Sequence, residues 1–197
     1  TLFGTNRIIS ITQNGGDIYG LNPEKAWNYG VSIRKIFSLW GGNGDITADY
    51  YVTDFTDQVV VDWEEKGRIS FYDLNGKRRA NSFQLALDYS PFKALNFRFA
   101  YKNYDAKTIY NSGFLQRPLQ AKHIFFGNIG WETDRSIKGG QLRWDLTFHA
   151  VGEQRLVDTI RDIRNPYAPA YGLWNSQLTR AFSQKFEIYT GVENLGN

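Results

Sequence analysis

The clearest pattern in the chain is a strict alternation of apolar and polar residues over residues 141–150. The apolar positions of this stretch are Leu142, Trp144, Leu146, Phe148 and Ala150. A helix would scatter these side chains around its circumference, whereas a strand places them all on one face. The pattern therefore predicts a strand with one apolar and one polar face. It leaves open whether the apolar face looks into a protein core or out into a lipid bilayer.

Further stretches alternate in the same way and are separated by turn-forming residues. These predicted strands cover residues 27–37, 45–55, 82–89, 95–101, 122–132, 171–182 and 186–192. The alternation is weaker in 122–132 and in 171–182. Together with 141–150, the pattern predicts an all-β fold built as an antiparallel meander of about eight strands.

The connections between the predicted strands alternate between short and long. The long ones cover residues 56–80, 105–121 and 151–169. A meander with this rhythm has its short turns at one end and its long loops at the other, as transmembrane β-barrels do. A soluble lipocalin-like barrel can also show it, so both classes stay open. Loop 56–80 contains its own predicted hairpin, QVVVDW and RISFYDL around EEKG, which we expect to stand up as a two-stranded ribbon.

The two faces of the predicted strands differ in chemistry. Aromatic residues lie on the apolar faces, several near strand ends where a membrane barrel carries its aromatic girdles: Trp27, Tyr29, Tyr50, Tyr89, Tyr101, Trp131 and Trp144. The polar faces carry both signs of charge: Arg34, Asp45, Asp49, Asp88, Arg98, Lys102, Arg143, Asp145 and Glu187. In a wide, hydrated barrel such charges can pair across adjacent strands. A soluble barrel with an aromatic core would look similar.

Composition says little more about the fold, but it excludes several classes of function. The 197 residues include no cysteine, which excludes disulfides, thiol catalysis and Cys-based zinc sites. The net charge is +3, with both signs interspersed, so nucleic acid is not an expected partner. His123 and His149, the two histidines, fall on different predicted strands. We therefore predict no catalytic residues, no metal site, no cofactor and no enzymatic activity.

Local sequence runs carry a resemblance to a known family. LNPEKAWNYGVSI (21–33) resembles a strand-opening run of TonB-dependent outer-membrane receptors, and GVENLGN (191–197) resembles the end of their penultimate barrel strand. Between them, DYYVTDFTDQVVV (49–61) and RPLQAKHIFFGNIGW (117–131) look like a strand climbing into an external loop and a strand returning from one. In this order the runs make nearly the whole chain similar to that family.

The resemblance implies an architecture and a location. The chain would be a partial segment of a transmembrane β-barrel of about 22 strands with a plugged lumen. Residues 1–197 would form a single segment of the C-terminal barrel domain, with the plug domain and the last strand absent. Two open sheet edges are a liability, so we do not expect this segment to fold alone. Family members lie in the outer membrane of Gram-negative bacteria.

The resemblance also implies a function and partners. We expect an active-transport receptor that binds a large, scarce ligand at its external loops and imports it with TonB energy coupling. An iron chelate such as a siderophore, haem or a cobalamin-like molecule would fit, and a glycan remains open. The expected partners are the TonB complex, acting through the missing plug, and outer-membrane lipid, with a surface lipoprotein as a further candidate. The alternative is a soluble β-barrel or lectin-like module that binds an apolar ligand or sugar.

The long loops supply the candidate ligand-binding residues. Aromatic rings and guanidinium groups can hold a bulky chelate through stacking and charge. The candidates are Tyr104, Tyr110, Phe114, Arg155, Arg161 and Arg164. Lys77, Arg78 and Arg79 form the densest basic run, which is either a solvated loop or a contact for lipid phosphates or an anionic ligand.

Overall fold

The computed structural model describes residues 8–12, 15–16, 19–65, 67–74, 78–157 and 165–196. Within these ranges there is no helix long and apolar enough to cross a membrane. The elements of the described chain are β-strands joined by turns and loops.

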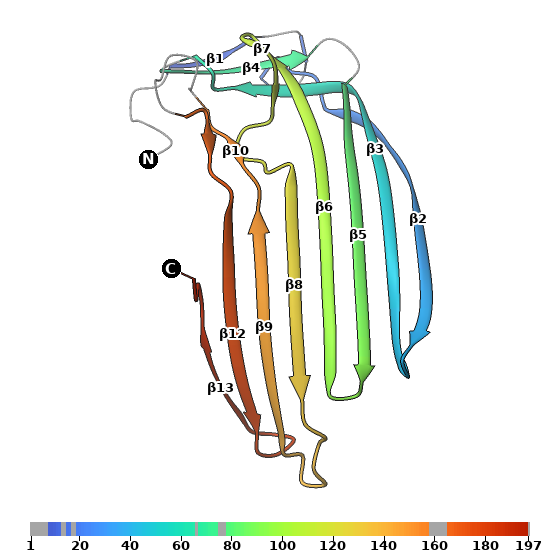
Figure 1. Ribbon diagram of the computed structural model, residues 1–197. Coiled ribbons are helices and arrows are strands. Elements are labelled where there is room, and N and C mark those ends of the chain that lie inside the picture. The colour runs from blue at the N-terminus through green and yellow to red at the C-terminus, as the bar shows by residue number, and fades with distance from the viewer. Residues whose placement is uncertain are drawn as a thin grey trace.

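The main sheet is an open antiparallel meander (Figure 1). Its long strands are β2 (Lys25–Leu39), β3 (Gly42–Asp62), β5 (Arg78–Phe92), β6 (Leu95–Tyr110), β8 (His123–Glu132), β9 (Gln141–Val151), β12 (Tyr171–Ala181) and β13 (Glu187–Val192). Each pairs with the next along the chain in this series. The predicted strands are thus confirmed, and the sheet is not closed, as expected for part of a barrel.

Shorter strands gather at the end of the sheet that carries the long loops (Figure 1). They are β1 (Ile8–Ile11), β4 (Arg68–Leu74), β7 (Gly113–Gln116), β10 (Gln154–Arg155) and β11 (Tyr167–Ala168). β4 pairs with the upper part of β3, β7 pairs with the upper part of β6, and β1 pairs with β4 in parallel. The short turns lie at the opposite end, so the predicted asymmetry is confirmed.

The hairpin predicted within loop 56–80 is present, because Gln58–Asp62 pairs with Ser70–Leu74. The expectation that it stands upright is wrong: β4 runs across the loop end of the sheet (Figure 1). The physical reason is burial. Val60 and Leu74 pack with Tyr110 of β6 in a small apolar cluster, which holds the hairpin down over its neighbours.

Cross-strand register sorts the side chains of the sheet into two faces. On the apolar face, directly paired residues form rows, such as Leu85 with Tyr101 and Tyr101 with Phe125. A shallow depression of about 550 Å³ crosses this face, lined by residues that include Leu87, Phe99, Phe125, Phe148 and Trp174. Near the short turns Trp131 pairs with Trp144, whose indole N–H donates to Ser176 Oγ over 2.9 Å. Such a polar-tipped ring near a strand end fits the predicted aromatic girdle.

The opposite face carries charge pairs that bridge adjacent strands. Arg34 Nε lies 3.0 Å from Asp45 Oδ1. Asp45 is directly opposite Asp88, and the Asp88 carboxylate accepts a hydrogen bond from Arg98. The carboxylates therefore lie between two arginines rather than facing each other unscreened. The predicted pairing of opposite charges on the polar face is confirmed.

Candidate functional site

The long connections fold together into one structure at the loop end, which we call the loop cap. It comprises residues 56–65, 67–74, 105–121 and 151–157. Its apolar centre is the buried cluster of Val60, Leu74 and Tyr110, which are 2 %, 8 % and 4 % exposed. Tyr72 and Leu115 pack against this cluster. Apolar residues from separate loops thus give the cap a small core of its own, which favours one arrangement of the loops.

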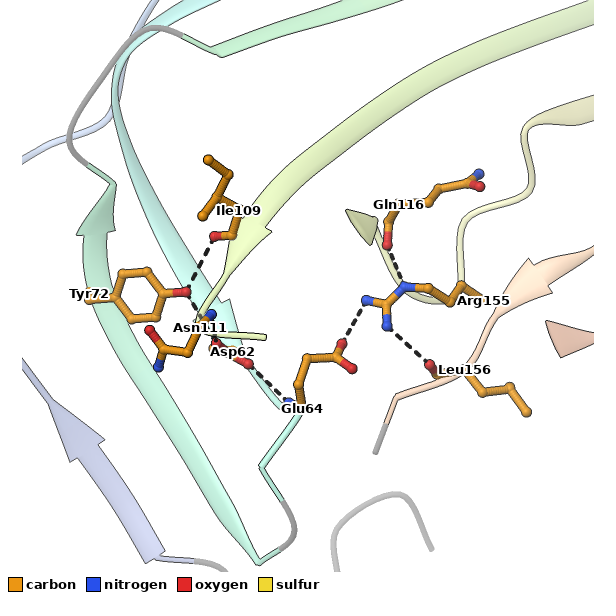
Figure 2. Close-up of polar contacts among 8 residues, drawn as sticks. All are labelled: Asp62, Glu64, Tyr72, Ile109, Asn111, Gln116, Arg155 and Leu156. Atoms are coloured by element: carbon orange, nitrogen blue, oxygen red, sulfur yellow. Dashed lines mark hydrogen bonds and ion pairs between the residues drawn. The ribbon is translucent and has the colours of Figure 1, made fainter. Parts of the chain in front are cut away.

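A buried ion pair joins two of these loops (Figure 2). Glu64 Oε1 lies 2.6 Å from Arg155 Nη2, and the two side chains are 3 % and 5 % exposed. Arg155 Nε donates to the Gln116 carbonyl over 2.6 Å, and Nη1 donates to the Leu156 carbonyl over 3.4 Å. The guanidinium carbon also lies 5.3 Å from the centroid of the Tyr110 ring. Because burying charge is costly unless it is paired and hydrogen-bonded, this geometry holds only while the loops stay in place.

Asp62 forms a second polar node close to the first (Figure 2). The residue is 4 % exposed. The carboxylate accepts hydrogen bonds from the Glu64 N–H at 3.0 Å, the Tyr72 hydroxyl at 3.1 Å and the Asn111 N–H at 2.9 Å. These three donors replace the water that the buried carboxylate has lost. The node therefore ties the β3–β4 hairpin to the turn between β6 and β7.

Burial also controls the two phenols of the cap. Burial, strengthened by the negative charge of Asp62, raises the pKa of Tyr72 above its ordinary value. Burial raises the pKa of Tyr110 as well, although the positive charges of Arg155 and Arg117 oppose that rise. Both hydroxyls are therefore neutral at physiological pH. Tyr72 can consequently act as the hydrogen-bond donor that Asp62 requires.

A pocket of about 480 Å³ opens beside the buried cluster. Its lining mixes apolar and polar groups, including Gln58, Val59, Val61, Trp63, Thr108, Tyr110, Arg117, Leu119, Gln120 and Val157. The size falls within the range of small-molecule sites, about 300–1,000 Å³. The Leu119 N–H donates to the Arg155 carbonyl over 2.8 Å, and Leu119 has a positive φ of 57°. The wall that carries Arg117 is therefore fixed against the residue that pairs with Glu64.

The structure brings together some of the predicted ligand-binding residues and separates others. Tyr110 lines the pocket, and Arg155 lies against its ring. Tyr104 is half-buried on β6, opposite Ser82, and is not part of this lining. Phe114 lies on β7, is 58 % exposed and does not line the pocket. Arg161 and Arg164 lie outside the described residues. A ligand-binding role stays a prediction for all six.

Sequence reasoning missed four residues that shape the cap: Asp62, Trp63, Glu64 and Arg117. The hairpin itself was predicted, and alternation along β3 would have placed Asp62 on the same buried face as Gln58 and Val60. No local signal pairs Glu64 with Arg155, because the two lie in loops far apart in the sequence. In the described ranges, no group of three or more histidine or acidic residues is placed to hold a metal ion.

Comparison with known proteins bears on the whole sheet. Residues 1–195 match the family model described as "TonB dependent receptor-like, beta-barrel". The match spans every strand from β1 to β13. No curated protein matches the chain.

Proposed function

Because the chain belongs to the TonB-dependent receptor-like β-barrel family, we propose that it is part of an outer-membrane receptor that imports a large, scarce ligand with TonB energy coupling. This family consists of outer-membrane β-barrel receptors that act in transport, which argues against the soluble alternative. In this arrangement the apolar face contacts lipid, and the charged face lines a hydrated lumen. The plug, the TonB complex and a surface lipoprotein are the partners that the proposal requires or allows.

The observation that carries the proposal is the pocket in the loop cap. Its lining offers an indole at Trp63, a guanidinium at Arg117 and the apolar side chain of Leu119. An aromatic ring and a positive charge in the lining of one pocket suit a bulky, partly anionic molecule. These groups favour an iron chelate, haem or a cobalamin-like ligand, and a glycan is the competing cargo.

The buried polar nodes explain how such a pocket can be specific. Most of its lining comes from the β3–β4 hairpin and from the segment after β7, and the Glu64–Arg155 pair holds these together. A site whose walls are fixed before binding loses less conformational entropy when the ligand arrives. We therefore assign the ion pair a positioning role and assign ligand contact to Trp63 and Arg117.

Binding and transport can be tested together in the full-length receptor. Four probes would be titrated against the purified protein by tryptophan fluorescence: haemin, cyanocobalamin, a ferric tris-catecholate and a maltooligosaccharide. We expect one probe to bind and to accumulate in cells only when TonB is present. Trp63→Ala and Arg117→Gln should each weaken that binding about tenfold or more, or about 1.4 kcal/mol. Lys93→Gln, in the β5–β6 turn at the far end, is the control and should bind as the wild type does.

Accumulation of the bound probe without TonB would contradict the transport proposal. Unchanged affinity in both pocket variants would remove this pocket from the site. The ligand contacts would then be expected among the other predicted candidates, which are Tyr104, Phe114, Arg161 and Arg164.

A further inference from the structure

A second hollow lies at the loop end of the apolar face, away from the pocket in the cap. We call it the rim hollow. It has a volume of about 720 Å³, and its lining includes Trp27, Tyr29, Asp54, Phe55, Arg78 and Arg79. These residues come from β2, β3 and β5, and none of them lines the pocket in the cap. The rim hollow is therefore a separate feature of the fold.

Register locates the rim hollow relative to the apolar face. Residues that pair directly across antiparallel strands point to the same side of a sheet. Val31, Tyr50 and Phe83 form one row of the apolar face. Two rows further toward the loops, Asp54 is paired with both Trp27 and Arg79. On the loop side, the apolar face thus ends in a row that contains the Trp27 ring, the Asp54 carboxylate and the Arg79 guanidinium.

Arg79 is held in a defined orientation in that row. Its Nε and Nη2 atoms donate to the two Asp54 carboxylate oxygens over 2.8 Å and 3.2 Å. The Tyr29 hydroxyl also donates to Asp54 Oδ2, over 2.7 Å. The Arg79 side chain is nevertheless 61 % exposed. The guanidinium is therefore held in one orientation by Asp54, and its remaining N–H groups are exposed to the surroundings.

A second cation, Arg78, lines the rim hollow with Arg79, and a third, Lys107, contacts the same Phe114 ring as Arg78. The Arg78 Nε is buried without a hydrogen-bond acceptor in the described part of the chain. Lys107 lies two residues beyond Asp105, so alternation puts it on the apolar side of β6. Arg78 and Lys107 approach the Phe114 ring to 5.9 Å and 5.8 Å, and no ion pair of Lys107 occurs among the described residues. The two arginines of the rim hollow exceed the charge of Asp54, and among the described residues the buried Arg78 N–H lacks an acceptor.

These groups identify the kind of ligand. If the apolar face contacts hydrocarbon, its loop-side limit lies at the depth of lipid headgroups. Indole and phenol rings are favoured at that depth, and guanidinium groups match phosphate oxygens in geometry and charge. We propose that the rim hollow binds the phosphate group of an anionic lipid of the outer membrane. The inference rests on the proposed function only for the placement of the apolar face in that membrane.

The test uses the full-length receptor in detergent and native mass spectrometry with added phosphatidylglycerol or phosphatidylcholine. We expect the wild type to retain phosphatidylglycerol preferentially. In the double variant Arg78→Gln/Arg79→Gln, which changes the two lining arginines, the apparent dissociation constant should rise about tenfold. The matched control is Arg34→Gln, because Arg34 binds Asp45 with the same two-pronged geometry and is 62 % exposed, but lies on the polar face. The control should bind as the wild type does.

Inorganic phosphate at millimolar concentration separates the lipid from a free anion. Wild-type protein that binds phosphate but shows no preference for phosphatidylglycerol would overturn the lipid assignment. Equal affinity of the double variant and the wild type would overturn the site. Neither rim residue lines the cap pocket, so cargo uptake should persist in the double variant. If the wild type shows no TonB-dependent uptake, the proposed function is refuted, whereas the lipid measurement still stands.

Discussion

The buried ion pair of the loop cap can be broken at one partner, and the cost can be estimated from its surroundings. Arg155→Met removes the guanidinium but keeps a long apolar side chain. The Glu64 side chain, 3 % exposed, would then lose its counterion, and the Gln116 carbonyl would lose its 2.6 Å donor. Breaking a buried pair at one end typically costs about 3–5 kcal/mol. Since about 1.4 kcal/mol is a factor of ten, opening of the cap should become about 10²- to 4 × 10³-fold more frequent.

Amide hydrogen exchange on the full-length receptor measures this opening directly. The Leu119 and Asn111 amides report on the cap, because they donate to the Arg155 carbonyl and to Asp62. Amides between β8 and β9 should stay protected, because the loss is local. The control Arg34→Met breaks a solvent-exposed pair, 62 % exposed at the arginine, and should cause no measurable change in the cap.

The double variant Glu64→Leu/Arg155→Met distinguishes the effect of the two charges from the effect of side-chain packing. Removing both charges leaves no isolated buried ion, so most of the protection should return. The reasoning is refuted if Arg155→Met exchanges like the wild type. It is also refuted if the double variant is as labile as the single one, because the packing and carbonyl contacts of Arg155 would then matter more than its charge.

Two other predictions concern the cap and the sheet. The raised pKa of Tyr72 means that the folded cap favours the protonated phenol, so this contribution is complete below the ordinary phenol pKa of about 10 and is lost as the pH rises through the higher folded value. Absorbance titration should therefore show a late-ionising phenol that Tyr72→Phe removes, and ionisation of that phenol near pH 10 would contradict this. Gly42→Ala should lower the yield of folded barrel on heat-modifiability gels, because the added Cβ would lie 2.4 Å from the Ser90 carbonyl oxygen. Gly127→Ala, whose Cβ would lie 3.4 Å from the Phe99 ring, should fold normally, and equal yields would count against the steric argument.

The sheet could be predicted from the sequence because the residue pattern within each strand is enough to identify that strand. Alternation at Leu142, Trp144 and Leu146 sorts side chains onto two faces whatever the neighbouring strand is. Strand ends were less accurate: β6 runs on to Tyr110, into a segment expected to be loop, and β3 continues without a break into the predicted hairpin. The end of β6 stays extended because β7 supplies its backbone partners, which is information that no single segment carries.

The cap was predictable only in part, for the same reason. Aromatic and basic residues in long loops pointed to Tyr110 and Arg155, and the two do meet. Their burial depends on contacts between loops that are distant in sequence, and alternation says nothing about such contacts. Residue type alone therefore proposed Arg155 as a ligand contact, whereas its position behind Tyr110, paired with Glu64, suits a residue that holds the pocket wall.

The parallel pairing of β1 with β4 sets an order on how the molecule assembles. Ile8–Ile11 pairs with Arg68–Phe71, and a hydrogen bond joins the Ser10 and Ser70 hydroxyls, 60 positions apart, over 2.9 Å. Closing so long a stretch of chain costs entropy that is recovered only once β4 already lies on β3. We therefore expect β1 to dock only after the β3–β4 hairpin has formed. Until β1 docks, the β4 edge that it covers carries backbone N–H and C=O groups without strand partners, so chain cleavage by an added protease should be fastest at this edge.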